Sequence, residues 1–216
     1  IGMTGLLLDT ALDEDQRRYA EMVRSSGESL LGLINDILDF SKIEAGKLVM
    51  ERLDFDLRVL LDELAELMAV RTQEKGLEFL CAVSSAVPDK LIGDPGRLRQ
   101  TLINLIGNAI KFTARGEISL RVTLEEEGEQ EALIRFSVRD TGIGIPGDRQ
   151  AQLFEKFTQV DGATTRQYGG TGLGLSITQH LVQAMGGQVS VHDNTPHGTV
   201  FRVELAAAEA RSSEAA

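Results

Sequence analysis

A stretch of about thirty residues near the start of the chain carries apolar side chains at steps that alternate near four and three. The positions are Tyr19, Val23, Leu30, Leu33, Ile37 and Phe40, with Ser26 in the one polar slot. This spacing places the side chains along one side of an α-helix and is typical of a coiled coil or helical bundle. The sequence DEDQ at 13–16 is a capping box, so we expect the helix to begin there and to run to about residue 45.

The apolar stripe is wider than a two-stranded coiled coil needs, because Leu31, Ile34 and Leu38 lie beside it. A wide stripe predicts a four-helix bundle. The chain supplies only a hairpin for such a bundle, with the apolar stretch that ends at Leu8 as the end of the first helix. We therefore expect a homodimer. The alternative is a long helix that packs on its own domain.

After residue 46 the pattern changes to strands and helices of an α/β domain. We expect strands at 53–57, 77–83, 132–140, 188–193 and 199–205, and one beginning at 117. We expect helices at 58–75, 95–113 and 151–157, and one that ends at 185. Three parts follow: a partial helical hairpin at 1–46, an α/β domain at 47–206 and a flexible tail at 207–216.

Composition excludes several classes of function. The 216 residues carry a net charge of −11, which disfavours binding to DNA or RNA. No apolar run approaches the ~18 residues that would span a membrane, so we expect no membrane contact. The chain shows no basic signal-peptide region, and its single cysteine, Cys81, allows no internal disulfide. A cytoplasmic location is the expectation.

One helix carries an unusual polar face. Asn104, Asn108 and Lys111 step by four and three along the sequence RLRQTLINLIGNAIKFT, so they share one side of an otherwise apolar helix. A buried amide without a partner costs about 1–3 kcal/mol. Amide and phosphate oxygens together suit Mg²⁺. The alternative for Asn108 is an amide that is hydrogen-bonded to the backbone.

A second motif, RDTGIGIP, places Asp140 at the end of a strand, before a turn that contains Gly142 and Gly144. A carboxylate there can accept a hydrogen bond from an exocyclic amine, and the alternative is a simple strand-end turn.

The third motif, YGGTGLGL, leads into a helix. A helix N-terminus offers free N–H groups and a partial positive charge, which favour phosphate. The P-loop ending is missing, and a glycine-rich loop without a ligand is the alternative.

Taken in this order, the motifs resemble the catalytic core of two-component sensor histidine kinases. NLIGNAIKFT resembles the N box of the family, DTGIGI the G1 box, FEKF the F box and GGTGLGL the G2 box. DILDFSKIEAGKL resembles the end of the second dimerisation helix, especially in hybrid kinases. The resemblance implies an α/β sandwich at 47–206 that binds ATP, a fold shared with gyrase, chaperone and mismatch-repair ATPases. It also implies transfer of the ATP γ-phosphate to a histidine, and then to an aspartate in the receiver domain of a response regulator.

The resemblance also implies roles for individual residues. Asn108 would hold Mg²⁺ with Asn104 beside it, and Lys111 would meet the phosphates as a point charge. Phe112 would lie against adenine, and Asp140 would bond the adenine amine. The implied nucleotide-binding set is completed by Gly142, Gly144, Gly170, Thr171, Gly172, Leu173, Gly174 and Thr199. A lid over the triphosphate is expected at 158–171.

One departure from the family concerns histidine. The chain has only His180, His192 and His197, all in the expected nucleotide domain, and none resembles a phosphoacceptor. The acceptor is therefore expected upstream of Ile1. Two alternatives stay open: a nucleotide-binding dimerisation module without phosphotransfer, and a gyrase- or mismatch-repair-type ATPase. Such an ATPase needs a carboxylate to activate water, and Asn104 occupies the corresponding position.

Overall fold

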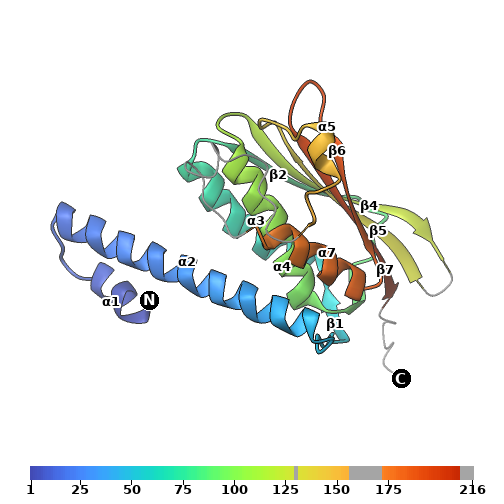
Figure 1. The fold of residues 1–216 in the computed structure, drawn as a ribbon, viewed down its shortest axis with the longest axis horizontal. Coiled ribbons are helices and arrows are strands. Elements are labelled where there is room, and N and C mark those ends of the chain that lie inside the picture. The colour runs from blue at the N-terminus through green and yellow to red at the C-terminus, as the bar shows by residue number, and fades with distance from the viewer. Residues whose placement is uncertain (129–130, 156–171, 210–216) are drawn as a thin grey trace. The chain divides into compact units, whose positions relative to one another are not determined.

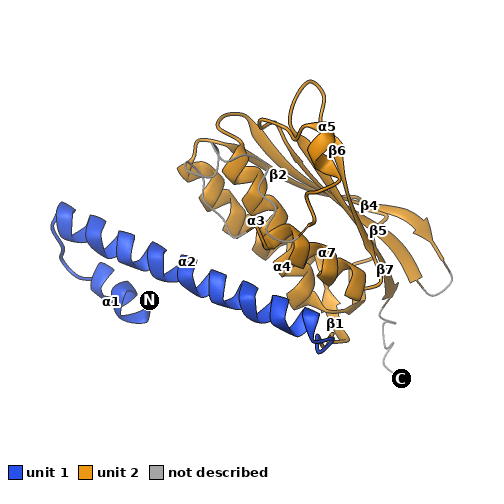
Figure 2. Ribbon diagram, viewed as in Figure 1, with its two compact units in different colours: residues 1–48 blue, residues 49–216 orange. Residues whose placement is uncertain are grey.

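The chain divides into two compact units, residues 1–48 and 49–216 (Figure 2). The computed structural model describes residues 1–128, 131–155 and 172–209. The division lies two residues beyond the boundary expected at 46. Within the described ranges, no helix has both the length and the apolar character needed to cross a membrane.

The first unit consists of α1, Gly2–Leu8, and α2, Glu14–Glu44 (Figure 1). The expected capping box begins α2: Asp13 accepts from the Gln16 backbone N–H at 2.8 Å, and the Gln16 side chain accepts from the Asp13 N–H at 3.2 Å. Along α2 the stripe predicted from the sequence stays largely exposed. Its exposed members include Tyr19, Val23, Leu30, Leu33 and Ile37.

The second unit holds the sheet and the helices that cover it. Its strands are β1 Leu53–Asp56, β2 Glu78–Val83, β3 Lys90–Gly93, β4 Glu117–Glu127, β5 Glu131–Asp140, β6 Gln188–Asp193 and β7 Thr199–Glu209. Its described helices are α3 Leu57–Glu74, α4 Pro95–Phe112, α5 Gly147–Gln150 and α7 Gly174–Ala184.

The sheet runs in the order β1-β3-β7-β5-β4-β2, with β6 paired to β7. The β2–β4 pair is parallel, and the others are antiparallel. Burial alternates along β4, β5 and β7, as expected for a sheet with one covered face. Helices α3, α4 and α7 lie on that covered face (Figure 1). A helical region followed by an α/β sandwich, the fold expected from the sequence, is confirmed.

Asp94 determines where α4 begins. Its Oδ1 accepts from the Arg97 backbone N–H at 2.9 Å, which is the usual role of a capping carboxylate. Its Oδ2 accepts from the backbone N–H of Glu51 at 3.0 Å. One buried side chain therefore joins the first turn of α4 to the segment that precedes β1.

The helix expected at 151–157 is wrong. The helical turn instead covers α5, Gly147–Gln150, directly after the N-cap residue Pro146. Residues 151–155 form turns because Leu153 and Phe154 pack into the core there. Residues 156 and 157 lie outside the described ranges.

The tail expected at 207–216 overlaps the last strand, and residues 210–216 lie outside the described ranges. Strand β7 continues to Glu209, because Ala206, Ala207 and Ala208 pair with Leu133, Ala132 and Glu131 of β5. The last two residues of β7 also pair with β3. Backbone pairing with these neighbouring strands thus overrides the weak strand preference of alanine.

Candidate functional site

Asp140 ends β5 on the helix side of the sheet and is 5% exposed. Its Oδ1 accepts two backbone N–H groups, from Gly142 at 2.9 Å and from Thr199 at 3.2 Å. Burial raises the pKa of this carboxyl group, and the two N–H donors lower it by less. Since Oδ2 accepts from no residue that the structure describes, a fixed carboxylate oxygen remains available to a ligand donor.

Two residues that the sequence analysis missed hold the backbone of Asp140. Asn194 donates from its side-chain nitrogen to the Asp140 carbonyl at 2.7 Å, and its N–H bonds the Gly198 carbonyl at 3.1 Å. Gly198 has φ +110° and lies so close to the Asp140 carbonyl that a Cβ would collide with it. The sequence HGTV at 197–200 could have indicated a turn that needs Gly198, whereas no local pattern indicates a role for Asn194.

The turn after Asp140 lies against the end of α4. A Cβ on Gly142 would stand 2.5 Å from the Phe112 carbonyl oxygen, so this close approach requires glycine. The Ile143 N–H donates to the same carbonyl at 3.4 Å. Beside this contact the Thr113 hydroxyl is buried, with no hydrogen-bond partner among the described residues. Gly144, with φ +72°, lies beside Gly198.

The polar face predicted on α4 is half-buried. Lys111 places Nζ 4.9 Å from the centroid of the Phe112 ring, and burial lowers the pKa of this lysine. The Asn108 amide is partly exposed and makes no hydrogen bond to the described part of the chain. An uncommitted amide oxygen and a lysine therefore lie one turn apart on one helix.

Asn104 contacts α7 instead. Its amide nitrogen donates to the Thr178 hydroxyl at 2.7 Å. A Cβ on Gly174 would stand 2.6 Å from its Oδ1, so glycine lets the first turn of α7 approach α4 closely. The amide thereby positions the N-terminus of α7 beside the polar face of α4.

The glycine motif is only partly described. Gly172 has φ +70°, and the buried Leu173 is the N-cap residue of α7. The predicted site residues Gly170 and Thr171, and the whole lid expected at 158–171, lie outside the described residues.

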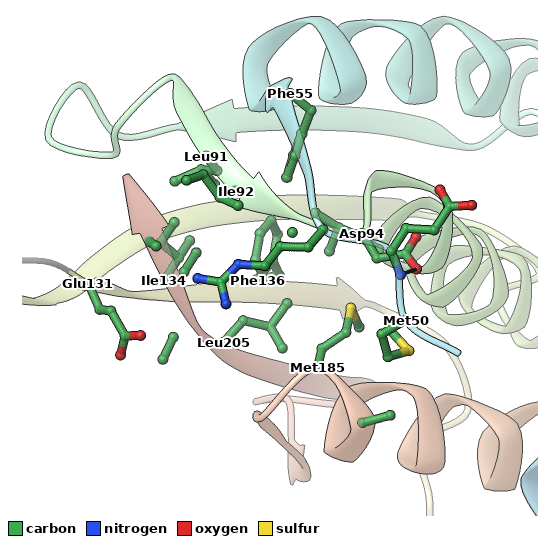
Figure 3. Close-up of a pocket in the computed structure, with 18 residues that line it drawn as sticks. Met50, Phe55, Leu91, Ile92, Asp94, Glu131, Ile134, Phe136, Met185 and Leu205 are labelled. Carbon is green, nitrogen blue, oxygen red and sulfur yellow. Dashed lines mark hydrogen bonds between the residues drawn. The ribbon is translucent and has the colours of Figure 1, made fainter. Parts of the chain in front are cut away.

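A cavity of about 330 Å³ is lined by none of these residues (Figure 3). Met50, Phe55 and Leu91 contribute to its lining, with Met185 from the segment after α7. None of the residues predicted to bind nucleotide lines it. In the parts of the chain that the structure describes, no three or more His, Cys, Asp or Glu side chains gather as a metal cluster.

Comparison with known proteins gives two family matches. The His Kinase A (phospho-acceptor) domain matches residues 1–46, which contain no histidine. The family described as histidine kinase-, DNA gyrase B-, and HSP90-like ATPase matches residues 93–209.

Curated relatives match almost the whole chain. Signal transduction histidine-protein kinase BarA of Escherichia coli (strain K12) is 48% identical over 201 residues, which cover 93% of this chain and 22% of BarA. Sensory/regulatory protein RpfC of Xanthomonas campestris pv. campestris is 44% identical over 205 residues, covering 94% of this chain and 28% of RpfC. The chain thus spans less than a third of either relative.

A solved structure supports the same conclusion. The crystal structure of full-length ShkA in complex with AMPPNP matches 98% of this chain and 43% of ShkA, with a TM-score of 0.77 and 41% sequence identity. The chain belongs to the histidine kinase-, DNA gyrase B- and HSP90-like ATPase family, and carries a His Kinase A phospho-acceptor domain ahead of its ATP-binding domain.

Proposed function

We propose that the chain is the ATP-binding, phosphoryl-donating core of a protein-histidine kinase that works in the cytoplasm. It transfers the γ-phosphate of ATP to a histidine that precedes Ile1 in the full protein. The phosphoryl group then passes to an aspartate in a response-regulator receiver domain. The observation that carries this proposal is the buried Asp140 carboxylate, held by the Gly142 and Thr199 N–H groups beside the end of α4.

Adenine selection follows from that carboxylate. Oδ1 is committed to two backbone donors, so Oδ2 accepts the exocyclic amine of adenine. Phe112, at the end of α4, supplies an apolar ring against the base. Guanine presents a carbonyl where adenine has its amine, and two acceptors would then face each other. The site therefore favours ATP over GTP.

The phosphates lie at the polar face of α4 and the N-terminus of α7. Lys111 supplies a positive charge. Burial lowers its pKa, and a nearby phosphate would counter this shift by stabilising the protonated form. The Asn108 amide oxygen fits a hard cation because no described residue engages it. A bound Mg²⁺ would add positive charge that offsets the triphosphate. These groups hold the γ-phosphate for in-line attack by a neutral imidazole.

A gyrase-type ATPase is less well supported. That chemistry needs a carboxylate to activate water, and the residue in the corresponding position is Asn104. Its amide nitrogen is committed to Thr178 and its oxygen lies against Gly174. An amide held in this way positions two helices and is a poor general base.

The metal assignment is tested by Asn108→Ala. We expect Mg²⁺ to increase ATP affinity in the wild type and to have little effect in this variant, because the amide oxygen is lost. Isothermal titration with and without Mg²⁺ measures the difference. Asn108→Asp is the matched control, since it keeps an oxygen ligand and should keep the Mg²⁺ dependence. An alanine variant with full Mg²⁺ dependence would show that the ion is held elsewhere.

The homodimer is tested on the exposed stripe of α2. Burying a leucine or isoleucine side chain contributes about 1.5–3 kcal/mol. We therefore expect Leu30→Glu with Ile37→Glu to raise the dimer dissociation constant by at least about a hundredfold. Ser25→Glu with Asn35→Glu adds the same charges on the polar side of α2 and should leave the dimer intact. Sedimentation equilibrium measures both, and equal dissociation in the two variants would exclude this stripe as the interface.

A further inference from the structure

The face of the sheet opposite the helices carries a cluster of arginines. Alternation along β4, β5 and β7 buries Ile118, Phe136 and Val203 against the helices. The intervening positions face the other way, and three of them are Arg121, Arg139 and Arg202. In the described part of the second unit, no helix packs on this face.

Strand register places the three arginines around one hydroxyl. Ser137 of β5 pairs with Arg121 of β4 on one side and with Arg202 of β7 on the other. Arg139 lies two residues along β5, on the same face. Neighbouring strands lie about 4.8 Å apart, so the backbones of Arg121 and Arg202 are separated by about 10 Å. These four residues are called the arginine face below.

The three arginines of the arginine face differ from the neighbouring Arg135 in their ion pairing with carboxylates. Arg135 has carboxylates on both sides, Glu125 at 2.7 Å and Glu204 at 2.7 Å. None of the three arginines has a carboxylate within 4 Å among the described residues, although Arg202 still contributes to the lowered pKa of Glu204. Three guanidinium groups without a carboxylate in direct contact among the described residues thus stand on one sheet face, in a chain of net charge −11.

The position of this face separates it from the nucleotide residues. Arg139 immediately precedes Asp140, and successive residues of a strand point to opposite sides of the sheet. Asp140 is buried on the helix side, whereas Arg139 is exposed. An occupant of the arginine face therefore leaves the Asp140 carboxylate accessible.

We propose that the arginine face docks the acidic side of an α-helix from a protein partner. Carboxylates at positions i, i+4 and i+7 of a helix extend over about 10.5 Å. This length matches the separation of Arg121 and Arg202, with Arg139 beside the middle carboxylate. Guanidinium groups form paired hydrogen bonds with carboxylates, which adds geometric selectivity to the charge attraction.

A nucleic acid fits this face less well. Proteins that bind single strands place aromatic rings between their basic groups, on which the bases stack. The outward positions of β4, β5, β6 and β7 carry no Phe, Tyr or Trp in their described residues. The negative net charge also repels a long polyanion.

The test uses the 216-residue chain and a synthetic alanine-rich helical peptide with glutamates at i, i+4 and i+7. Arginine Nε–Hε NMR signals are followed during titration at low salt. We expect the signals of Arg121, Arg139 and Arg202 to shift together. Changing these three to glutamine should weaken binding at least tenfold, while the matched triple change at Arg17, Arg24 and Arg71 should not.

Three results would overturn the proposal. The first is equal binding by the arginine-face variant and the wild type. The second is equal binding of a peptide with the same composition but scrambled glutamate positions, which would show that helix spacing is not recognised. The third is tighter binding of oligothymidylate than of the helical peptide at this face. Circular dichroism checks that both triple variants fold, and the wild-type signals locate the contact independently of any variant.

Discussion

Replacing Asp140 with asparagine should weaken ATP binding by about 10- to 100-fold, because a hydrogen bond to a charged group contributes roughly 1.5–3 kcal/mol. The asparagine oxygen can still accept the Gly142 and Thr199 N–H groups, so the fold is retained. Its NH₂ group then faces the adenine amine, and two donors oppose each other. Calorimetric titration measures the loss. GTP is the matched ligand: it should bind the wild type weakly and respond little to the substitution. Equal affinity of the wild type for ATP and GTP would contradict the assignment.

The same variant should change how stability depends on pH. Burial raises the pKa of Asp140 in the folded chain above its unfolded value. A group with a raised pKa stabilises the fold fully below its unfolded pKa, and this contribution is lost as pH rises through the folded pKa. We therefore expect the wild type to lose stability relative to Asp140→Asn as the pH rises from acidic to neutral. Urea unfolding across this range measures the difference, and the opposite slope would mean that the N–H donors outweigh burial.

The largest expected effect concerns self-labelling with γ-labelled ATP. Two of the three histidines lie in regular elements of the nucleotide domain: His180 lies within α7, and His192 in β6 bonds the Ser190 hydroxyl at 3.0 Å. His197 lies in the loop between β6 and β7. We expect none of the three to present a nitrogen in line with the γ-phosphate. We expect this chain to bind ATP without labelling itself. A longer chain that includes the upstream part of the first helix should gain acid-labile, base-stable phosphate on a histidine.

Two outcomes would contradict that expectation. Stoichiometric phosphohistidine on the 216-residue chain would mean that one of its own histidines is the acceptor. No label on a folded, dimeric longer chain would favour a nucleotide-binding module without phosphotransfer. Adding the Asp140→Asn substitution to the longer chain separates the two steps, because labelling should fall with ATP occupancy and recover at saturating ATP.

Much of the fold could be predicted because local signals and tertiary packing agree. Neighbouring residues in the sequence were enough to predict three features. These are the capping box at Asp13, the start of α4 at Asp94–Pro95 and the strands with alternating burial. The predicted element boundaries were wrong where contacts with residues far away in the sequence determine the local structure. Ala206–Ala208 form strand because β5 pairs with them, and the turns after α5 form because Leu153 is drawn into the core.

The candidate site likewise contains residues whose positions local patterns predict and residues whose contacts they do not. The position of Asp140 at a strand end and that of Asn108 on the polar face of its helix could be predicted from the sequence, whereas their roles stay predictions. The partner of Asn104 could not, because Thr178 lies 74 positions away in the sequence. Asn194 supports Asp140 across 54 positions by a single side-chain bond, and no local pattern marks such a contact.

The double contact of Asp94 limits where the chain can bend. Because its two carboxylate oxygens hold Glu51 to the first turn of α4, residues from Glu51 onward move as part of the nucleotide domain. Helix α2 is continuous to Glu44. The connection between α2 and this fixed point comprises residues 45–50, where Gly46 adopts φ +62° and Val49 is 80% exposed. These six residues belong to no helix or strand, so the connection is made of irregular backbone alone.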